Sequence, residues 1–338
     1  MTYSSGSPTW RTYAFTTAAA VLVLAGCSSQ GVGGAGGASA ESHELRVLFQ
    51  AQGEHSVVAL AELDGSHVTY PLDDLPGGNQ TNPDWSPDGS RLVFVLDDGS
   101  RESLWVADAD GGHARELVPC RRACAWLDDP DWSPDGSSVV YSRTESRGTA
   151  GWGSLETVDV DTGQVSVILE ARVRTFTAGA RWAPDGSQIV FESVHKGGPG
   201  IGAEVDGVAL KIVAADSRKP GKALTQADLF AATADWSPDG ASIVYSALAT
   251  PDSEAPDLFV ISPGGGDPLR LTTLGDNGGY AAEPAWRADS NRVVFSGQLP
   301  DSFLSGVLLT VSADGGAEPV ELGDTTITGR HPRVEPGA

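Results

Sequence analysis

The stretch Trp85-Ser86-Pro87-Asp88-Gly89 decides the fold, because the chain repeats it. Close copies begin at Trp132, Trp182 and Trp236, and a degraded copy, Trp-Arg-Ala-Asp-Ser, begins at Trp286. Successive tryptophans therefore lie 47, 50, 54 and 50 residues apart. Self-similarity at a period of this length is typical of a stacked or radial array of one structural unit.

Each copy predicts a tight turn followed by a buried strand. Pro presets φ at the second position of a four-residue turn, Asp can bond its own backbone, and Gly supplies a positive φ at the fourth position. A short apolar run follows each turn, as in Leu92-Val-Phe94 and Val139-Val-Tyr141. Apolar runs without alternation are typical of strands covered on both faces. A blade that lies between two other blades provides that environment.

The Trp-Ser-Pro-Asp-Gly repeat resembles the propeller repeat of the TolB family, over most of the chain beyond about residue 44. TolB-type propellers are periplasmic and contact envelope lipoproteins, so the resemblance implies a binding role in the cell envelope. TolB also carries a separate N-terminal domain, for which we expect no room in this chain. Only the propeller is therefore carried over.

We predict an all-β fold over residues 44–338, a propeller of six blades with four antiparallel strands each. Leu45–Phe49 matches the second strand of a repeat, but no turn motif precedes it. At the other end, His331-Pro-Arg-Val334 resembles the lead-in Asn82-Pro-Asp-Trp85. We therefore expect the C-terminal segment to supply the innermost strand of the first blade, which closes the ring and leaves no free sheet edge.

The N-terminal residues 1–26 are typical of an export signal. Arg11 precedes an apolar stretch, Ala14 to Leu24, that is too short to span a bilayer. The stretch ends in Leu24-Ala-Gly-Cys27, which resembles the lipobox of bacterial lipoproteins, where the signal is cut before a Cys that becomes lipidated. An ordinary secretory signal with a chance Cys is the alternative. We expect Cys27 to anchor the protein to the outer face of the cell membrane, or facing the periplasm, with residues 27–43 as a flexible tether.

Composition and cysteine spacing restrict the partners. The formal net charge of −23 repels phosphate backbones, so we expect no nucleic acid. Cys120 and Cys124 lie close together in an exported chain, which favours a disulfide, whereas zinc would need two further ligands. No nucleophile elbow or phosphate-binding glycine loop is visible. We expect no cofactor, no bound metal and a monomer.

Candidate site residues precede the motif tryptophans at fixed distances. Six residues before lie Asn79, Trp126, Phe176, Phe230 and Tyr280, with Thr328 in the closing strand. Three residues before lie Asn82, Asp129, Gly179, Thr233, Glu283 and His331, and one before lie Asp84, Asp131, Arg181, Asp235, Ala285 and Arg333. The aromatic set could ring the mouth of the central channel and bind apolar groups, sugars or cations, or it could pack as core between blades.

The polar positions are open to two interpretations. They could hold a peptide or a cation, or their side chains could be satisfied by backbone amides. Asp129, Glu283 and His331 form the only set that resembles a catalytic or metal constellation. We expect the propeller to bind a protein, peptide or envelope polymer without catalysis, at a mouth that includes the aromatic set, these three residues, Arg181 and Arg333. The alternative is an enzyme, lyase or hydrolase-like, with or without a metal, that acts there on a polysaccharide or peptide.

Overall fold

The computed structural model describes residues 45–337 apart from 76, 122–123, 148–149, 171–174, 199–203, 218, 220 and 324–325. The expected export signal, Cys27 and the tether lie outside the described residues. Within the described ranges, no helix is both long enough and apolar enough to cross a membrane.

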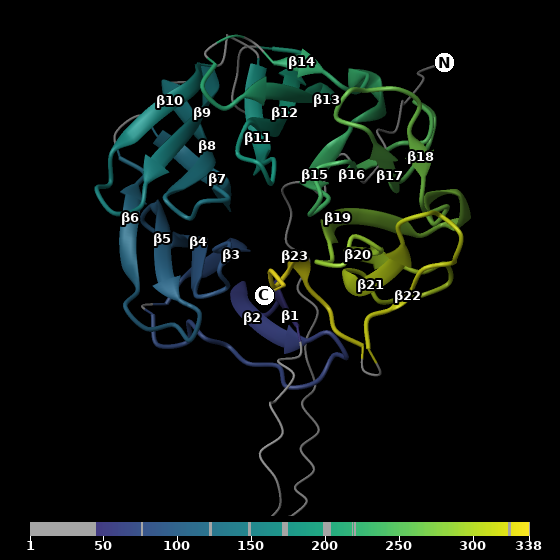
Figure 1. Ribbon diagram of the computed structural model, residues 1–338, viewed down its shortest axis with the longest axis horizontal. Helices are drawn as coiled ribbons and strands as arrows, with labels where there is room; N and C mark the ends of the chain where they lie inside the picture. The colour runs from purple at the N-terminus through teal and green to yellow at the C-terminus, as the bar shows by residue number, and fades with distance from the viewer. Residues whose placement is uncertain are drawn as a thin grey trace, which may run out of the picture.

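Six antiparallel sheets are arranged radially around one axis (Figure 1). The first blade contains β23 (Arg330–Val334), β1 (Arg46–Ala51) and β2 (Val57–Glu62), and the second β3 (Asn79–Trp85), β4 (Arg91–Asp97), β5 (Glu102–Asp108) and β6 (Arg115–Pro119). The third contains β7 (Cys124–Trp132), β8 (Ser138–Arg147), β9 (Ala150–Asp159) and β10 (Val165–Glu170). The fourth contains β11 (Thr175–Trp182), β12 (Gln188–Lys196), β13 (Val205–Ala214) and β14 (Lys222–Ala223). The fifth contains β15 (Ala232–Trp236), β16 (Ile243–Ala247), β17 (Asp257–Ile261) and β18 (Leu269–Arg270), and the sixth β19 (Tyr280–Trp286), β20 (Arg292–Gln298), β21 (Val307–Ser312) and β22 (Val320–Glu321).

The predicted six-bladed propeller is therefore confirmed, including its closure. The C-terminal strand β23 pairs antiparallel with β1, and Leu48 lies opposite Arg333 (Figure 1). The Arg46 guanidinium fastens the same junction through an ion pair of 2.7 Å to Glu335. The fourth strand of the first blade is reduced to one bridge, between Leu60 and Thr69.

The repeated turns have the predicted chemistry. Asp88 accepts hydrogen bonds from the Ser86 hydroxyl at 2.7 Å and from the Ser90 amide at 3.0 Å. Gly89 adopts a φ of 67° and donates its amide to the Ser86 carbonyl at 2.8 Å. In the three copies with Ser before Pro, one carboxylate holds both arms of the turn and so fixes the register of the hairpin that joins the first two strands of a blade.

The core lies between blades. The runs after each turn are fully buried, as Leu92, Val93 and Phe94 show with exposed fractions of 0%. One cluster joins Val93 of the second blade to Trp132 and Tyr141 of the third. Burial on both sheet faces thus explains why these strands lack polar alternation.

Candidate functional site

The residues one before each tryptophan link neighbouring blades along the central channel. Asp131 accepts the backbone amide of Trp182 at 2.7 Å, and Asp235 accepts that of Trp286 at 2.7 Å. Asp84 accepts the amide of Trp132 at 3.2 Å. Each carboxylate therefore connects its own blade to the next one, which is the structural alternative that the sequence left open.

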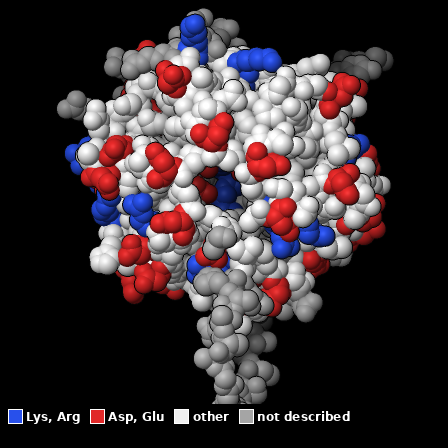
Figure 2. All heavy atoms as spheres, in the orientation of Figure 1, with Lys and Arg blue, Asp and Glu red and all other residues white. Residues whose placement is uncertain are grey.

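Two arginines complete this ring. In blade order its members are Arg333, Asp84, Asp131, Arg181, Asp235 and Ala285, so the arginines belong to opposite blades. Arg181 Nε lies 3.8 Å from Asp131 Oδ1, and Arg333 Nε lies 3.7 Å from Asp84 Oδ1. Burial raises the pKa of Asp84 and of Asp235 to about 6. In the space-filling view, acidic side chains surround a central hollow in which basic side chains are visible (Figure 2).

The residues three before each tryptophan form a second ring. All six have a φ between 48° and 55°, and the pairing register of the innermost strand shifts at this position in each blade. Asp129 accepts the Gly179 amide at 2.9 Å, and Glu283 accepts the His331 amide at 2.9 Å. The side chain of one blade thus satisfies the backbone that the bulge exposes on the next blade.

In the fourth blade, the side chain that accepts the backbone amide of the next blade comes from the second strand and not from the innermost one. Gly179 has no side chain to offer to the next blade. Glu192, on β12, accepts the Thr233 amide at 2.7 Å instead, and its carboxylate lies where a Cβ on Gly179 would be. Burial raises the pKa of Glu192 to about 7.

The set Asp129, Glu283 and His331 is not brought together. Asp129 lies on the third blade, opposite the sixth blade that carries Glu283. His331 Nε2 lies 3.6 Å from Glu283 Oε1, but Arg330 also pairs with this carboxylate at 2.6 Å. Burial raises the pKa of Glu283, yet the charges of His331 and Arg330 outweigh this and lower it. Among the described residues, no group of three His, Cys, Asp or Glu side chains could hold a metal ion.

Three of the four predicted aromatic residues are partly exposed. Tyr280 is the first residue of β19, Phe230 precedes β15 by two residues, and Trp126 is the third residue of β7, so all three lie on the face at which the innermost strands begin. Phe176 differs, because only 5% of it is exposed and the Lys196 ammonium lies 4.5 Å from its ring centroid. Trp126, Phe230 and Tyr280 are therefore partly exposed near the starts of their innermost strands, whereas Phe176 is buried.

Sequence reasoning missed a pair of apolar residues on the same face. Phe303 is fully exposed and Leu304 is 52% exposed, in the loop between β20 and β21. Tyr280 Oη anchors this loop through contacts of 2.9 Å with Ser305 Oγ and with the Gly306 amide. An apolar pair inside the polar stretch Pro-Asp-Ser-Phe-Leu-Ser-Gly was the available signal.

The predicted disulfide between Cys120 and Cys124 is present, with a Cα–Cα distance of 5.2 Å. It joins Cys120, which directly follows β6, to Cys124, the first residue of β7, two residues before Trp126. The disulfide therefore fixes the start of the strand that carries Trp126.

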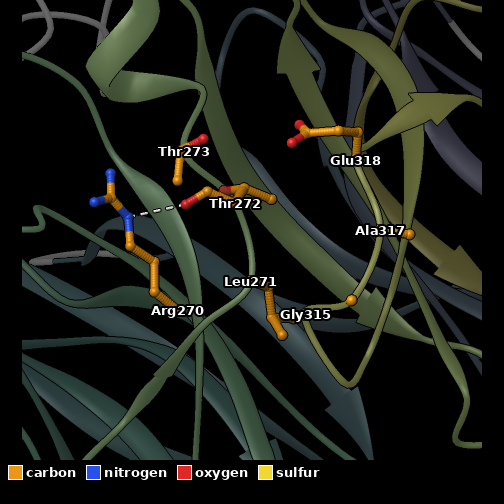
Figure 3. A pocket seen from close by; sticks show the side chains of 8 residues that line it. Arg270, Leu271, Thr272, Thr273, Gly315, Ala317 and Glu318 are labelled. Atoms are coloured by element: carbon orange, nitrogen blue, oxygen red, sulfur yellow. Dashed lines mark hydrogen bonds between the residues drawn. The ribbon is translucent and has the colours of Figure 1, made fainter.

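A hollow of about 270 Å³ lies between the outer parts of the fifth and sixth blades (Figure 3). Arg270 Nε donates to the Thr272 carbonyl at 2.9 Å. The same guanidinium is paired with Asp257 at 2.6 Å and Asp276 at 2.8 Å. Its charge is thus neutralised by neighbouring carboxylates.

The geometry defines a six-bladed propeller whose ring is closed by its C-terminal strand. No known family pattern and no curated protein sequence matches the chain. Among solved structures, it is similar to TolB from Acinetobacter baumannii, with 20% identity, a TM-score of 0.66, and coverage of 87% of this chain and 67% of that one. It is also similar to an oligogalacturonate lyase in complex with manganese, with 19% identity, a TM-score of 0.56, and coverage of 80% of this chain and 72% of that one. A chain of a nidogen/laminin complex is similar with 10% identity, a TM-score of 0.61, and coverage of 86% of this chain and 98% of that one. At these identities the likeness shows the fold alone.

Proposed function

We propose that this chain is an exported lipoprotein whose propeller binds a protein or peptide segment, or an envelope polymer, at the channel mouth. The observation that carries the proposal is the partly exposed aromatic set of Trp126, Phe230 and Tyr280, on the same face as the exposed Phe303 and Leu304. Apolar and aromatic groups presented by loops on a rigid scaffold are typical of binding sites. Their burial by a ligand would supply the driving force for binding.

Binding is favoured over catalysis because the channel carboxylates already have structural partners. Asp129, Asp131, Asp235 and Glu283 each accept a backbone amide of a neighbouring blade. A general acid or base must instead reach a substrate proton. Carboxylates bonded to a neighbouring blade hold the blades together, so the aromatic side chains are the groups that contact the ligand.

The proposed anchor is Cys27, with residues 27–43 as a tether that holds the propeller away from the lipid. Replacing Cys27 by Ala should release the protein from the membrane into the soluble fraction. Fractionation of cells with an antibody to the propeller measures this. Continued recovery of the variant with the membrane would contradict the anchor.

Site-specific photo-crosslinking in intact cells tests the binding site. A photoreactive phenylalanine at position 303, which is fully exposed, should give one discrete adduct with an envelope component. The same group at Ala241, an exposed residue of the turn face, is the matched control and should give none. Equal adducts from both positions, or no adduct from position 303, would refute the proposed mouth.

A triple substitution separates binding from folding. Replacing Trp126, Phe230 and Tyr280 by Ala should remove the adduct at position 303 while the melting temperature changes little, because the three rings are partly exposed. A large loss of thermal stability would show that the rings are core instead.

A further inference from the structure

An open pocket of about 630 Å³ lies on the turn face, between the third and fourth blades. Its walls include Pro134, Asp135, Trp182, Pro184, Asp185 and Asp216. It is remote from the channel mouth, because the turn of Ser133–Gly136 follows β7, whereas the mouth residues stand at the starts of the innermost strands. The pocket therefore belongs to a different face of the disc.

The floor of the pocket is the one motif tryptophan that is only half-buried. Trp85, Trp132, Trp236 and Trp286 are between 4% and 7% exposed, whereas Trp182 is only partly buried. The turn that follows Trp182 has the same Pro-Asp-Gly sequence as those that follow Trp85, Trp132 and Trp236. The difference must therefore come from what covers the ring.

At two other blade junctions the chain covers the equivalent ring with arginine. The Arg91 guanidinium lies 4.6 Å from the centroid of the Trp132 ring, and that of Arg46 lies 5.0 Å from the Trp85 ring. Arg91 Nη2 also donates to the Gly136 carbonyl at 3.3 Å. A planar guanidinium stacked on an aromatic face gains both cation–π attraction and a hydrogen bond.

A second arginine assists at the junction of the second and third blades. Arg115, in the outermost strand of the second blade, donates to the Val160 carbonyl of the third blade at 2.6 Å. Arg91 and Arg115 together thus place two guanidinium groups across this junction.

At the junction that forms the pocket, serines occupy the positions equivalent to these two arginines. Ser138 follows Trp132 by six residues, as Arg91 follows Trp85. Ser166 pairs with Thr157 in the third blade, as Arg115 pairs with Val106 in the second. The pocket is therefore the space that guanidinium groups fill one blade earlier, and it keeps the same kind of floor, with Trp182 and Gly186 in place of Trp132 and Gly136.

We propose that this pocket binds an arginine side chain from a basic segment of a partner protein. The guanidinium stacks on Trp182 between the rings of Pro134 and Pro184, as the chain's own Arg91 stacks on Trp132. Asp135, Asp185 and Asp216 supply complementary negative charge, and no Lys or Arg is among the described residues that line the pocket. Arginine fits better than lysine, because its charge is planar and directs several donors at once.

The turn carboxylates keep their charge at neutral pH. Hydrogen bonds from Ser133 and Ser137 lower the pKa of Asp135, and hydrogen bonds from Ser187 lower that of Asp185. The net charge of −23 further favours the approach of a basic segment.

The test uses the full chain labelled with ¹⁵N at tryptophan, titrated with the peptide acetyl-Gly-Gly-Arg-Gly-Gly-amide. The Trp182 indole signal, assigned with a Trp182→Phe variant, should shift in a saturable way. The matching citrulline peptide, which lacks the charge, should bind about tenfold more weakly, as should the lysine peptide. Equal binding of the citrulline or the lysine peptide would overturn the assignment to arginine.

Two variants with the same charge change separate the pocket from general attraction. Ser138→Arg supplies the missing cover and should abolish the shift. Ser242→Arg makes the equivalent change on the fifth blade, six residues after Trp236, and should leave binding intact. Undiminished binding to Ser138→Arg, or equal loss in both variants, would overturn the proposal.

A converse variant tests the comparison between repeats. Arg91→Ser together with Arg115→Ser should uncover Trp132 and create a second site, so that the Trp132 indole signal also responds to the arginine peptide. A folded double variant whose Trp132 signal does not respond would overturn the argument from the second blade.

Discussion

Replacing Arg181 by Met should destabilise the propeller in a way that depends strongly on pH. Arg181 is 6% exposed, and its guanidinium lies among the carboxylates of Asp131, Asp129, Asp84 and Asp235. Met keeps most of the volume of the side chain but removes its charge. The variant therefore leaves several buried carboxylates without their shared cation.

The magnitude follows from the cost of a buried, unpaired charge. Removing one partner of such a group costs about 3–5 kcal/mol at pH 7.5. The carboxylates can escape this cost by binding a proton, and burial already raises the pKa of Asp84 and Asp235 to about 6. Because the variant's native state binds at least one more proton, its deficit should shrink by about 1.4 kcal/mol per pH unit as pH falls towards 5.5.

Urea denaturation followed by tryptophan fluorescence at pH 7.5 and 5.5 measures the two deficits. Arg333→Met is the matched control, since Arg333 Nε lies 3.7 Å from one carboxylate, that of Asp84 on the neighbouring blade. A deficit below about 1 kcal/mol at pH 7.5, or one that is equal at both pH values, would refute the claim that Arg181 neutralises the channel carboxylates.

Three further predictions follow from the other contacts. The free energy of unfolding of the unaltered protein should rise as pH falls from 7 to 5, because the folded-state pKa values of Asp235, about 6, and Glu192, about 7, lie above their unfolded values. Urea midpoints that fall over this pH range would contradict this prediction. Gly179→Ala should displace the Glu192 carboxylate from the Thr233 amide and lower the free energy of unfolding by about 2 kcal/mol, but by clearly less when Glu192 is already Ala. Equal losses in the two backgrounds of this double-mutant cycle would exclude coupling between Gly179 and Glu192. Replacing both cysteines of the disulfide Cys120–Cys124 by Ser should cost about 2 kcal/mol in thermal or urea unfolding, since the closed loop is short; an unchanged midpoint would show that the turn needs no covalent link.

The fold could be predicted because its determinants are local and repeated. The turn around Asp88 and Gly89 depends on five consecutive residues, and the chain offers it at a regular spacing. Closure was also visible, because the half-motif at His331–Val334 matched the missing strand of the first blade. Both signals are independent of what lies on neighbouring blades.

The site could be predicted only in part, because exposure depends on residues far away in the sequence. Trp126 and Phe176 occupy equivalent positions, yet Lys196, at the end of another strand, lies against Phe176. The role of Glu192 likewise arises only because Gly179 leaves a backbone amide of the next blade to be satisfied. Packing across blades, and not the local pattern, decides these cases.

The pocket above Trp182 is intermediate between these two situations. Its motif, Trp-Ala-Pro-Asp-Gly, is nearly the same as the others, so the motif alone does not indicate an uncovered ring. Two positions together do, because Ser138 and Ser166 stand where Arg91 and Arg115 lie one blade earlier. Comparison of the repeats with one another, rather than with a consensus, would have indicated the uncovered Trp182 ring.

The pairing of β23 with β1 also sets an order of events during synthesis. The ribosome makes β1 and β2 before any other strand of the ring, but their inner neighbour emerges only after the five other blades. The earliest blade is therefore the last to be completed, and until then Val47, Leu48 and Phe49, fully buried in the finished ring, lack one neighbouring strand. A ribosome stalled before Arg330 would hold a nascent chain with an open seam, which is a natural target for chaperones and proteases.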